Sequence, residues 1–92
     1  RMHRCCLLLG TTDTREMFLT DVIGMLQKVN RSHPRLSLLW LDDRRETTVP
    51  RVCIRIDDPS AVDDLAQILR TYPAFAECLW IDEDRAWDVQ VY

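Results

Sequence analysis

The residues best suited to chemistry lie in one short segment that precedes a predicted helix. The segment combines a glycine, three threonine hydroxyls, a carboxylate and a guanidinium: Gly10, Thr11, Thr12, Asp13, Thr14 and Arg15. The free amides and the dipole at a helix start favour an anion, so the segment is a candidate site for a small carboxylate such as an amino acid. The sequence favours plain capping, because Asp13 and Glu16 have the spacing of a capping box and would occupy those amides.

Four cysteines and two histidines are the other candidate ligands. The cysteines lie in or beside apolar runs, where a free thiol is usually buried, and they are Cys5, Cys6, Cys53 and Cys78. Neighbouring residues of a strand point to opposite faces, so Cys5 and Cys6 do not converge, and His3 and His33 stand alone. We therefore expect neither a metal nor a cofactor. Core thiols are typical of a reducing compartment, which predicts a cytoplasmic protein.

No nucleophile, base and orienting group form a recognisable set, so we predict that the protein is not an enzyme. An acylphosphatase-like hydrolase is the weakest alternative. Arg15 stands in the first loop, as that chemistry requires, but Gly10 is the loop's only glycine and cannot make a glycine-rich phosphate cradle.

Composition and charge limit the partners. The 92 residues suit one domain, with the 47% hydrophobic and 29% charged content of a soluble globular protein. The chain has no apolar run of the ~18–20 residues that a membrane span needs, so this segment is not expected to insert into a membrane. A net charge of −3 and the lack of aromatics in the first and third predicted strands argue against nucleic acid. The ends of the chain interrupt a pattern, which suggests a fragment of a longer protein.

Hydrophobic periodicity divides the chain into strands and helices. Apolar residues at helical spacing define the buried face of a first helix: Phe18, Leu19, Val22, Met25, Leu26 and Val29. The full prediction places strands at residues 3–9, 35–41, 51–56 and 75–81, helices at 13–30 and 58–72, and a polar hairpin connector at 42–50. A charged turn at 82–85 and alternation over 87–92 predict a short fifth strand at a sheet edge.

This order predicts an α+β fold of the ferredoxin-like β-α-β-β-α-β plan. Right-handed crossovers would place both helices on one face of a single antiparallel sheet, with the extra C-terminal strand at an edge. In the second strand, alternation predicts Leu36, Leu38 and Trp40 on one face and Ser37, Leu39 and Leu41 on the other.

The face without helices is the candidate interaction surface. Side chains alternate between the two faces, so the first strand can place Cys6 and Leu8 on this face and the second strand can place Leu39 and Leu41 there. These four are the candidate interface residues. An exposed apolar patch usually marks an interface, which predicts a homodimer that pairs sheets or sheet edges. The alternative is that a fifth strand or local side chains shield this face.

Two stretches resemble the ACT domain, a small regulatory module of β-α-β-β-α-β topology. Residues 14–26, TREMFLTDVIGML, resemble the family's Asp-Arg-Pro-Gly-Leu-Leu-x-Asp-Val-x-x-x-Leu signature, with Arg15, Asp21 and Val22 in matching positions. Residues 57–69, DDPSAVDDLAQIL, resemble its second helix. The chain departs from the pattern where Glu16 and Met17 replace the family's Pro-Gly. In members that bind an amino acid, that glycine lets the ligand approach the loop.

The resemblance implies a domain that dimerises and regulates a covalently attached catalytic or membrane domain, without necessarily binding an amino acid. The leading hypothesis from the sequence is therefore a non-catalytic regulatory or oligomerisation module. A sensor of an amino acid or another small carboxylate, using residues 10–15, is the second hypothesis, and the acylphosphatase-like hydrolase is the third.

Overall fold

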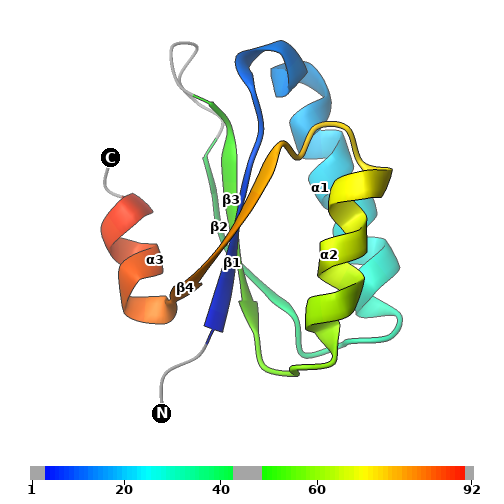
Figure 1. Cartoon of the computed structure of the whole chain (residues 1–92), viewed down its shortest axis with the longest axis vertical. Helices are drawn as coiled ribbons and strands as arrows, with labels where there is room; N and C mark the ends of the chain where they lie inside the picture. The colour runs from blue at the N-terminus through cyan, green and yellow to red at the C-terminus, as the bar shows by residue number, and fades with distance from the viewer. Residues whose placement is uncertain (1–3, 43–48, 91–92) are drawn as a thin grey trace.

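The computed structural model describes residues 4–42 and 49–90, in which an antiparallel sheet lies between a layer of two helices and a single third helix (Figure 1). The elements are β1 (Arg4–Leu9), the 3-10 turn η1 (Thr12–Thr14), α1 (Arg15–Asn30), β2 (Ser37–Asp42), β3 (Arg51–Ile56), α2 (Ala61–Thr71), β4 (Glu77–Asp82) and α3 (Glu83–Gln90). The predicted α+β class is confirmed. Most of the predicted connector at 42–50, as well as His3 and the last two residues, lies outside the described residues.

The sheet has the strand order β2-β3-β1-β4, and every neighbouring pair is antiparallel. β1 and β3 are central, while β2 and β4 are the edges. It follows that β1 and β2, which α1 connects, run parallel with β3 between them. In the same way β3 and β4, which α2 connects, run parallel with β1 between them.

The main core lies between the sheet and the layer of α1 and α2. Alternate residues of the central strands point into it, among them Cys6, Leu8 and Ile54, as the predicted alternation requires. The helices contribute fully or nearly fully buried side chains, which are Phe18, Val22, Met25, Val29, Ala61, Leu65 and Ile68. Leu19, a member of the predicted buried face of the first helix, is instead exposed, as is Val62 on α2.

The prediction for β2 was wrong about which residues share a face. A β-bulge interrupts the pairing with β3, so that Leu38 pairs with Ile54 and Trp40 pairs with its neighbour Cys53. The extra residue, Leu39, changes the alternation, and Leu38 and Trp40 therefore point to opposite faces. Alternation in the sequence cannot show this, because a bulge inserts one residue without changing the residue types.

The predicted fifth strand was also wrong, because residues 83–90 form the helix α3. Ala86 and Val89 are three residues apart, which places both on the side of a helix that faces the sheet. Ala86 is fully buried against Cys5, Leu7, Trp40 and Cys53, and Val89 packs against the same cluster. Burial of this face outweighs the alternation that favoured a strand, since β-propensity depends strongly on tertiary context.

Two side chains of the sheet attach α3 through its backbone. The Trp40 indole Nε1–H donates to the Ala86 carbonyl at 3.1 Å, and Arg51 Nη1 donates to the Val89 carbonyl at 2.9 Å. The last carbonyls of a helix lack partners within the helix, and a cation near them also interacts favourably with the dipole. A second helix layer thus covers the face that the sequence left open.

Candidate functional site

Gly10, the glycine of the predicted ligand loop, is buried by the fold. A Cβ atom at this position would lie 2.8 Å from both Phe18 Cδ1 and Pro50 Cγ, and 3.0 Å from the Ala74 carbonyl oxygen. Its amide donates to the Pro50 carbonyl at 2.9 Å. Glycine is therefore needed here because three segments of the chain meet at this point, and the space beside its backbone is already filled.

The polar groups around this loop bind other parts of the chain. The Thr11 amide donates to Thr14 Oγ1 at 3.0 Å, and Thr14 Oγ1 lies 3.3 Å from the Ala74 carbonyl oxygen. Asp21 Oδ2 accepts a hydrogen bond from the Ala74 amide at 3.3 Å. Thr14 and Asp21 thus join the start of α1 to the turn before β4. The predicted capping pair of Asp13 and Glu16 was wrong, since the threonines bond to each other at this turn and α1 has no side-chain cap.

The other residues of the predicted site lie around this tied loop. Thr12 and Asp13 are exposed at the turn η1, and Arg15 is half-buried in the first turn of α1. Two of the groups proposed to bind a carboxylate, the Thr11 amide and the Thr14 hydroxyl, are joined to each other. The loop therefore holds the fold together through hydrogen bonds between its threonines and to Ala74, and not through the predicted capping by Asp13 and Glu16.

The predicted interface residues do not share one open face. Cys6 and Leu8 are fully buried beneath α1 and α2, so they are not available to a second subunit in this conformation. Leu41 is half-buried and packs against the same core, whereas Leu39 packs against the cluster around α3. The bulge in β2 separates the two leucines, and α3 covers the face on which the interface was expected.

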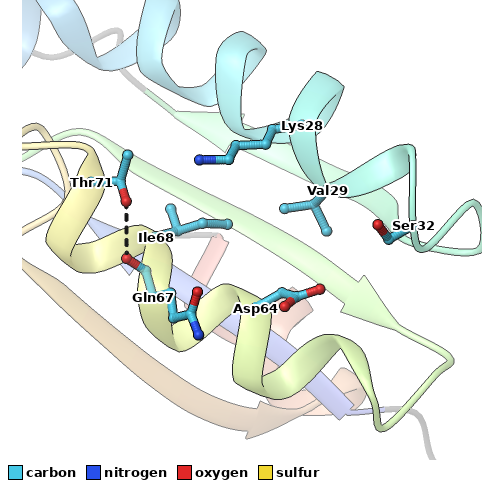
Figure 2. A pocket seen from close by; sticks show the side chains of 7 residues that line it. All are labelled: Lys28, Val29, Ser32, Asp64, Gln67, Ile68 and Thr71. Atoms are coloured by element: carbon cyan, nitrogen blue, oxygen red, sulfur yellow. Dashed lines mark hydrogen bonds between the residues drawn. The ribbon is translucent and has the colours of Figure 1, made fainter.

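The structure forms a groove between α1 and α2 that the sequence analysis did not identify (Figure 2). Its volume is about 270 Å³, and its lining residues are Lys28, Val29, Ser32, Asp64, Gln67, Ile68 and Thr71. Buried Val29 and Ile68 form its base. Figure 2 shows the Lys28 side chain extending from α1 over the groove, while Asp64 and Gln67 lie on α2. The groove therefore has an apolar base and a rim with one positive and one negative charge from different helices.

His33 lies at the end of this groove, in the loop after α1. Its Nε2 is 2.6 Å from Asp64 Oδ2, and its Nδ1 is 3.5 Å from both Asp58 Oδ2 and Ser60 Oγ. The Asp64 hydrogen bond raises the pKa of His33 above its usual value, and Asp58 adds to this effect. The ring therefore joins the α1–β2 loop to the start of α2, and its place between two carboxylates favours its protonated form.

The neighbours of His33 superficially resemble a catalytic triad. The Ser60 hydroxyl contacts the His33 imidazole, and the imidazole in turn contacts the Asp64 carboxylate. A general base must be neutral to accept a proton, whereas the carboxylates that raise the pKa of this imidazole favour its protonated form. Asp58 also shares Nδ1 with Ser60 and accepts a hydrogen bond from the Ser60 amide at 3.0 Å, which lowers the pKa of Asp58. The geometry thus fits an ion-pair link better than an activated nucleophile.

An open cavity of about 380 Å³ adjoins the cluster and is lined by His33, Pro34, Arg35, Asp57, Asp58 and Pro59. Sequence reasoning treated His33 as an incidental surface residue, but only 7% of its surface is exposed. Its partner Asp64 is 31 positions away, so no local spacing could indicate the contact. Among residues 4–42 and 49–90, no three His, Cys, Asp or Glu side chains are grouped so that they could hold a metal ion.

Comparisons with known proteins found no matching family model, no matching curated protein and no matching solved structure. Within the described part of the chain, no helix has the length and apolar character to cross a bilayer.

Proposed function

We propose that the protein is a non-catalytic regulatory or oligomerisation domain of ferredoxin-like, ACT-like type. The support is the strand order β2-β3-β1-β4. In this order the two strands of each β-α-β unit have one strand of the other unit between them. The resemblance at residues 14–26 adds to this support, as do the contacts of His33 with Asp64 and Asp58 and the filled first loop. In this proposal the domain pairs with a second copy and regulates a covalently attached catalytic or membrane domain in the cytoplasm.

The observation that carries the proposal is an apolar surface on the outer flank of α1. Leu19 and Ile23 lie one helical turn apart and are 44% and 49% exposed. Gly24, on the opposite flank, contacts Tyr72 at the end of α2, so Leu19 and Ile23 face away from α2. Leu38 of the edge strand β2 points toward the helix layer and is 46% exposed. We name Leu19, Ile23 and Leu38 the α1–β2 edge surface.

A second copy of this chain is the partner that fits the α1–β2 edge surface. An edge strand presents unpaired amides and carbonyls, and two copies of β2 can pair antiparallel about a two-fold axis. The same axis would bring the apolar flanks of the two α1 helices together. The sequence left open a dimer that pairs sheets or one that pairs sheet edges, and this proposal takes the sheet edge.

Light scattering across a dilution series tests the proposal. The wild-type mass is expected to fall from dimer to monomer on dilution, and Ile23→Glu should weaken the dimer at least about tenfold, since a charge at an apolar interface costs more than ~1.4 kcal/mol. Val62→Glu is the matched control, because Val62 is an exposed valine on α2. A wild-type monomer at every concentration, or equal weakening by both variants, would contradict the proposal.

The groove between α1 and α2 favours a second candidate function, the sensing of a small zwitterion such as an amino acid. Lys28 could bind the ligand carboxylate while the Asp64 carboxylate binds the ammonium group, and the groove volume of about 270 Å³ suits a small molecule. Lys28 has no ion pair with any described residue. This candidate retains the predicted ligand class and moves its site from residues 10–15 to the groove.

Thermal unfolding in the presence of each amino acid tests this candidate, because a ligand that binds only the folded state raises the unfolding temperature. A shift seen with wild type should disappear in Lys28→Met and persist in Arg70→Met, which removes a positive charge elsewhere on the helix layer. If no amino acid shifts the transition, the sensor hypothesis is wrong. A shift that survives Lys28→Met would place the site elsewhere.

A further inference from the structure

Two cysteines meet under the helix layer at an unusually short distance. Cys6 lies on β1 and Cys78 on the neighbouring edge strand β4, and their sulfur atoms are 2.7 Å apart. Cys78 is opposite Leu8 and Cys6 is opposite Trp80, so the cysteines are diagonal neighbours in the antiparallel pair. A disulfide bond has an S–S distance of about 2.05 Å, so the sulfurs need to move only about 0.6–0.7 Å closer.

The two thiols differ in exposure and in protonation. Cys6 is fully buried, whereas Cys78 is half-buried on an edge strand, where a small reagent can approach. The hydrogen bond between the sulfurs lowers the pKa of Cys78 and raises that of Cys6. The thiolate is the reactive form of cysteine, so Cys78 is the sulfur that should react first.

The other two cysteines form a contrasting pair on the opposite face of the sheet. Cys5 and Cys53 are both fully buried under α3. Burial raises the pKa of Cys5, and it is also the main cause that raises the pKa of Cys53 to about 12. Both therefore remain neutral thiols without access for a reagent, and they provide a control within the same protein.

We propose that Cys6 and Cys78 form a redox-active dithiol that a peroxide converts to a disulfide. The Cys78 thiolate attacks a peroxide oxygen, the O–O bond breaks, and a sulfenic acid forms as the sulfur loses two electrons to the peroxide. Cys6 then gives up its proton and attacks the Cys78 sulfur, so that the S–S bond forms, the S–O bond breaks and water leaves. With hydrogen peroxide, two thiols and one peroxide give one disulfide and two waters.

The disulfide would covalently link an edge strand to the centre of the sheet. Cys6 and Cys78 are 72 positions apart, so the bond would close a loop that contains α1, β2, β3 and α2. Such a loop restricts the unfolded chain, and the oxidised protein should unfold at a higher temperature than the reduced protein. The inference is independent of the dimer, because neither cysteine belongs to the α1–β2 edge surface.

Mass spectrometry of the full chain tests the inference. The reduced protein is treated with a small excess of hydrogen peroxide, denatured and alkylated with N-ethylmaleimide. The number of alkylated cysteines should fall from four to two. Apart from the alkyl groups, the mass of the chain should fall by two hydrogen atoms. Tryptic digestion should join residues 5–15 to residues 71–85 while the peptide with Cys53 stays alkylated, and dithiothreitol should restore all four thiols.

Variants assign the sulfurs and test the order of reaction. Cys6→Ser, which keeps a hydroxyl donor beside Cys78, should leave a Cys78 sulfenic acid that dimedone traps, whereas Cys78→Ala should give neither disulfide nor adduct. Cys5→Ser distinguishes Cys5 from Cys6 within their shared peptide and should leave the disulfide intact, as should Cys53→Ser. Four alkylated cysteines after peroxide, a linkage that includes Cys53, or a bond only between separate chains would overturn the inference.

Discussion

The two faces of the sheet are built from the same strands but differ in depth and in chemistry. The face under α1 and α2 has a broad apolar core that contains Phe18, Leu8 and Phe75. The face under α3 has a smaller cluster with polar support, because the Arg51 guanidinium lies 5.3 Å from the centre of the Trp40 ring and 3.1 Å from Asp42 Oδ2. We therefore expect the α1/α2 face to contribute more to the stability of the fold than the α3 face.

The same comparison applies to the cysteines of β1. Adjacent residues point to opposite faces, so Cys6 meets Cys78 beside an exposed edge, whereas Cys5 meets Cys53 beneath α3. The hydrogen bond between Cys6 and Cys78 lowers the pKa of Cys78, whereas burial is the main cause that raises the pKa of both Cys5 and Cys53. Residue type and strand are the same for Cys5 and Cys6, so the difference between them arises from the surroundings of each face.

The largest expected effect tests whether the α1/α2 face supplies most of the stability. Phe18 is fully buried and packs edge-to-face against Phe75, with ring centres 5.4 Å apart. Phe18→Ala should lower the free energy of unfolding by about 3–5 kcal/mol, as buried phenylalanine truncations do. Urea denaturation followed by circular dichroism measures the change. A loss below about 1 kcal/mol would show that the α1/α2 face is not the dominant core.

A smaller effect is expected from the opposite face. Trp40→Phe removes the hydrogen bond to the Ala86 carbonyl and part of the contact with α3, and it should cost about 1–2 kcal/mol. Hydrogen exchange should show the loss of protection mainly in α3 rather than in α1. Trp87→Phe is the control, because Trp87 lies on α3 but is 44% exposed. This variant should leave the exchange of α3 nearly unchanged. Equal loss of protection in α1 and α3 would mean that the two layers unfold as one unit.

The smallest effect concerns the ion-pair link at the end of the helix layer. The pKa of His33 is raised above its ordinary value of 6.5, so the folded state binds the proton more tightly than the unfolded state does. The resulting stabilisation is fully present below about pH 6.5 and is lost as the pH rises through the raised pKa. Asp58, with a lowered pKa, contributes above its ordinary value of 3.8 and loses its contribution as the pH falls further.

Urea denaturation of wild type and His33→Gln at several pH values measures this contribution. Wild type should lose stability between mildly acidic and mildly basic pH, and the variant should lose less over the same range. An identical pH dependence in the two proteins would exclude His33 as the group responsible. A variant that depends more strongly on pH than wild type would reverse the expected sign.

The α+β class, the four strands and the first two helices could be predicted because they depend on local periodicity. Phe18, Val22 and Met25 repeat at helical spacing, and Val52 and Ile54 alternate, so each segment's burial pattern is recorded in its own residues. The candidate site was less predictable. The sequence showed that Thr11 and Thr14 could bind an anion, but it could not show that their partners would be each other and the distant Ala74.

What the sequence determined by itself was therefore which segments form the four strands and the first two helices and which of their residues mostly avoid water, because side chains three, four or two positions apart decide this. Only the tertiary structure decided that residues 83–90 are a helix, that β2 contains a bulge, that Lys28 and Asp64 border one groove, and that Cys6 meets Cys78. These features arise from contacts between residues far apart in the chain. Their free energy depends on the shape and polarity of the partner surface, and neighbouring residues in the sequence do not indicate what that surface is.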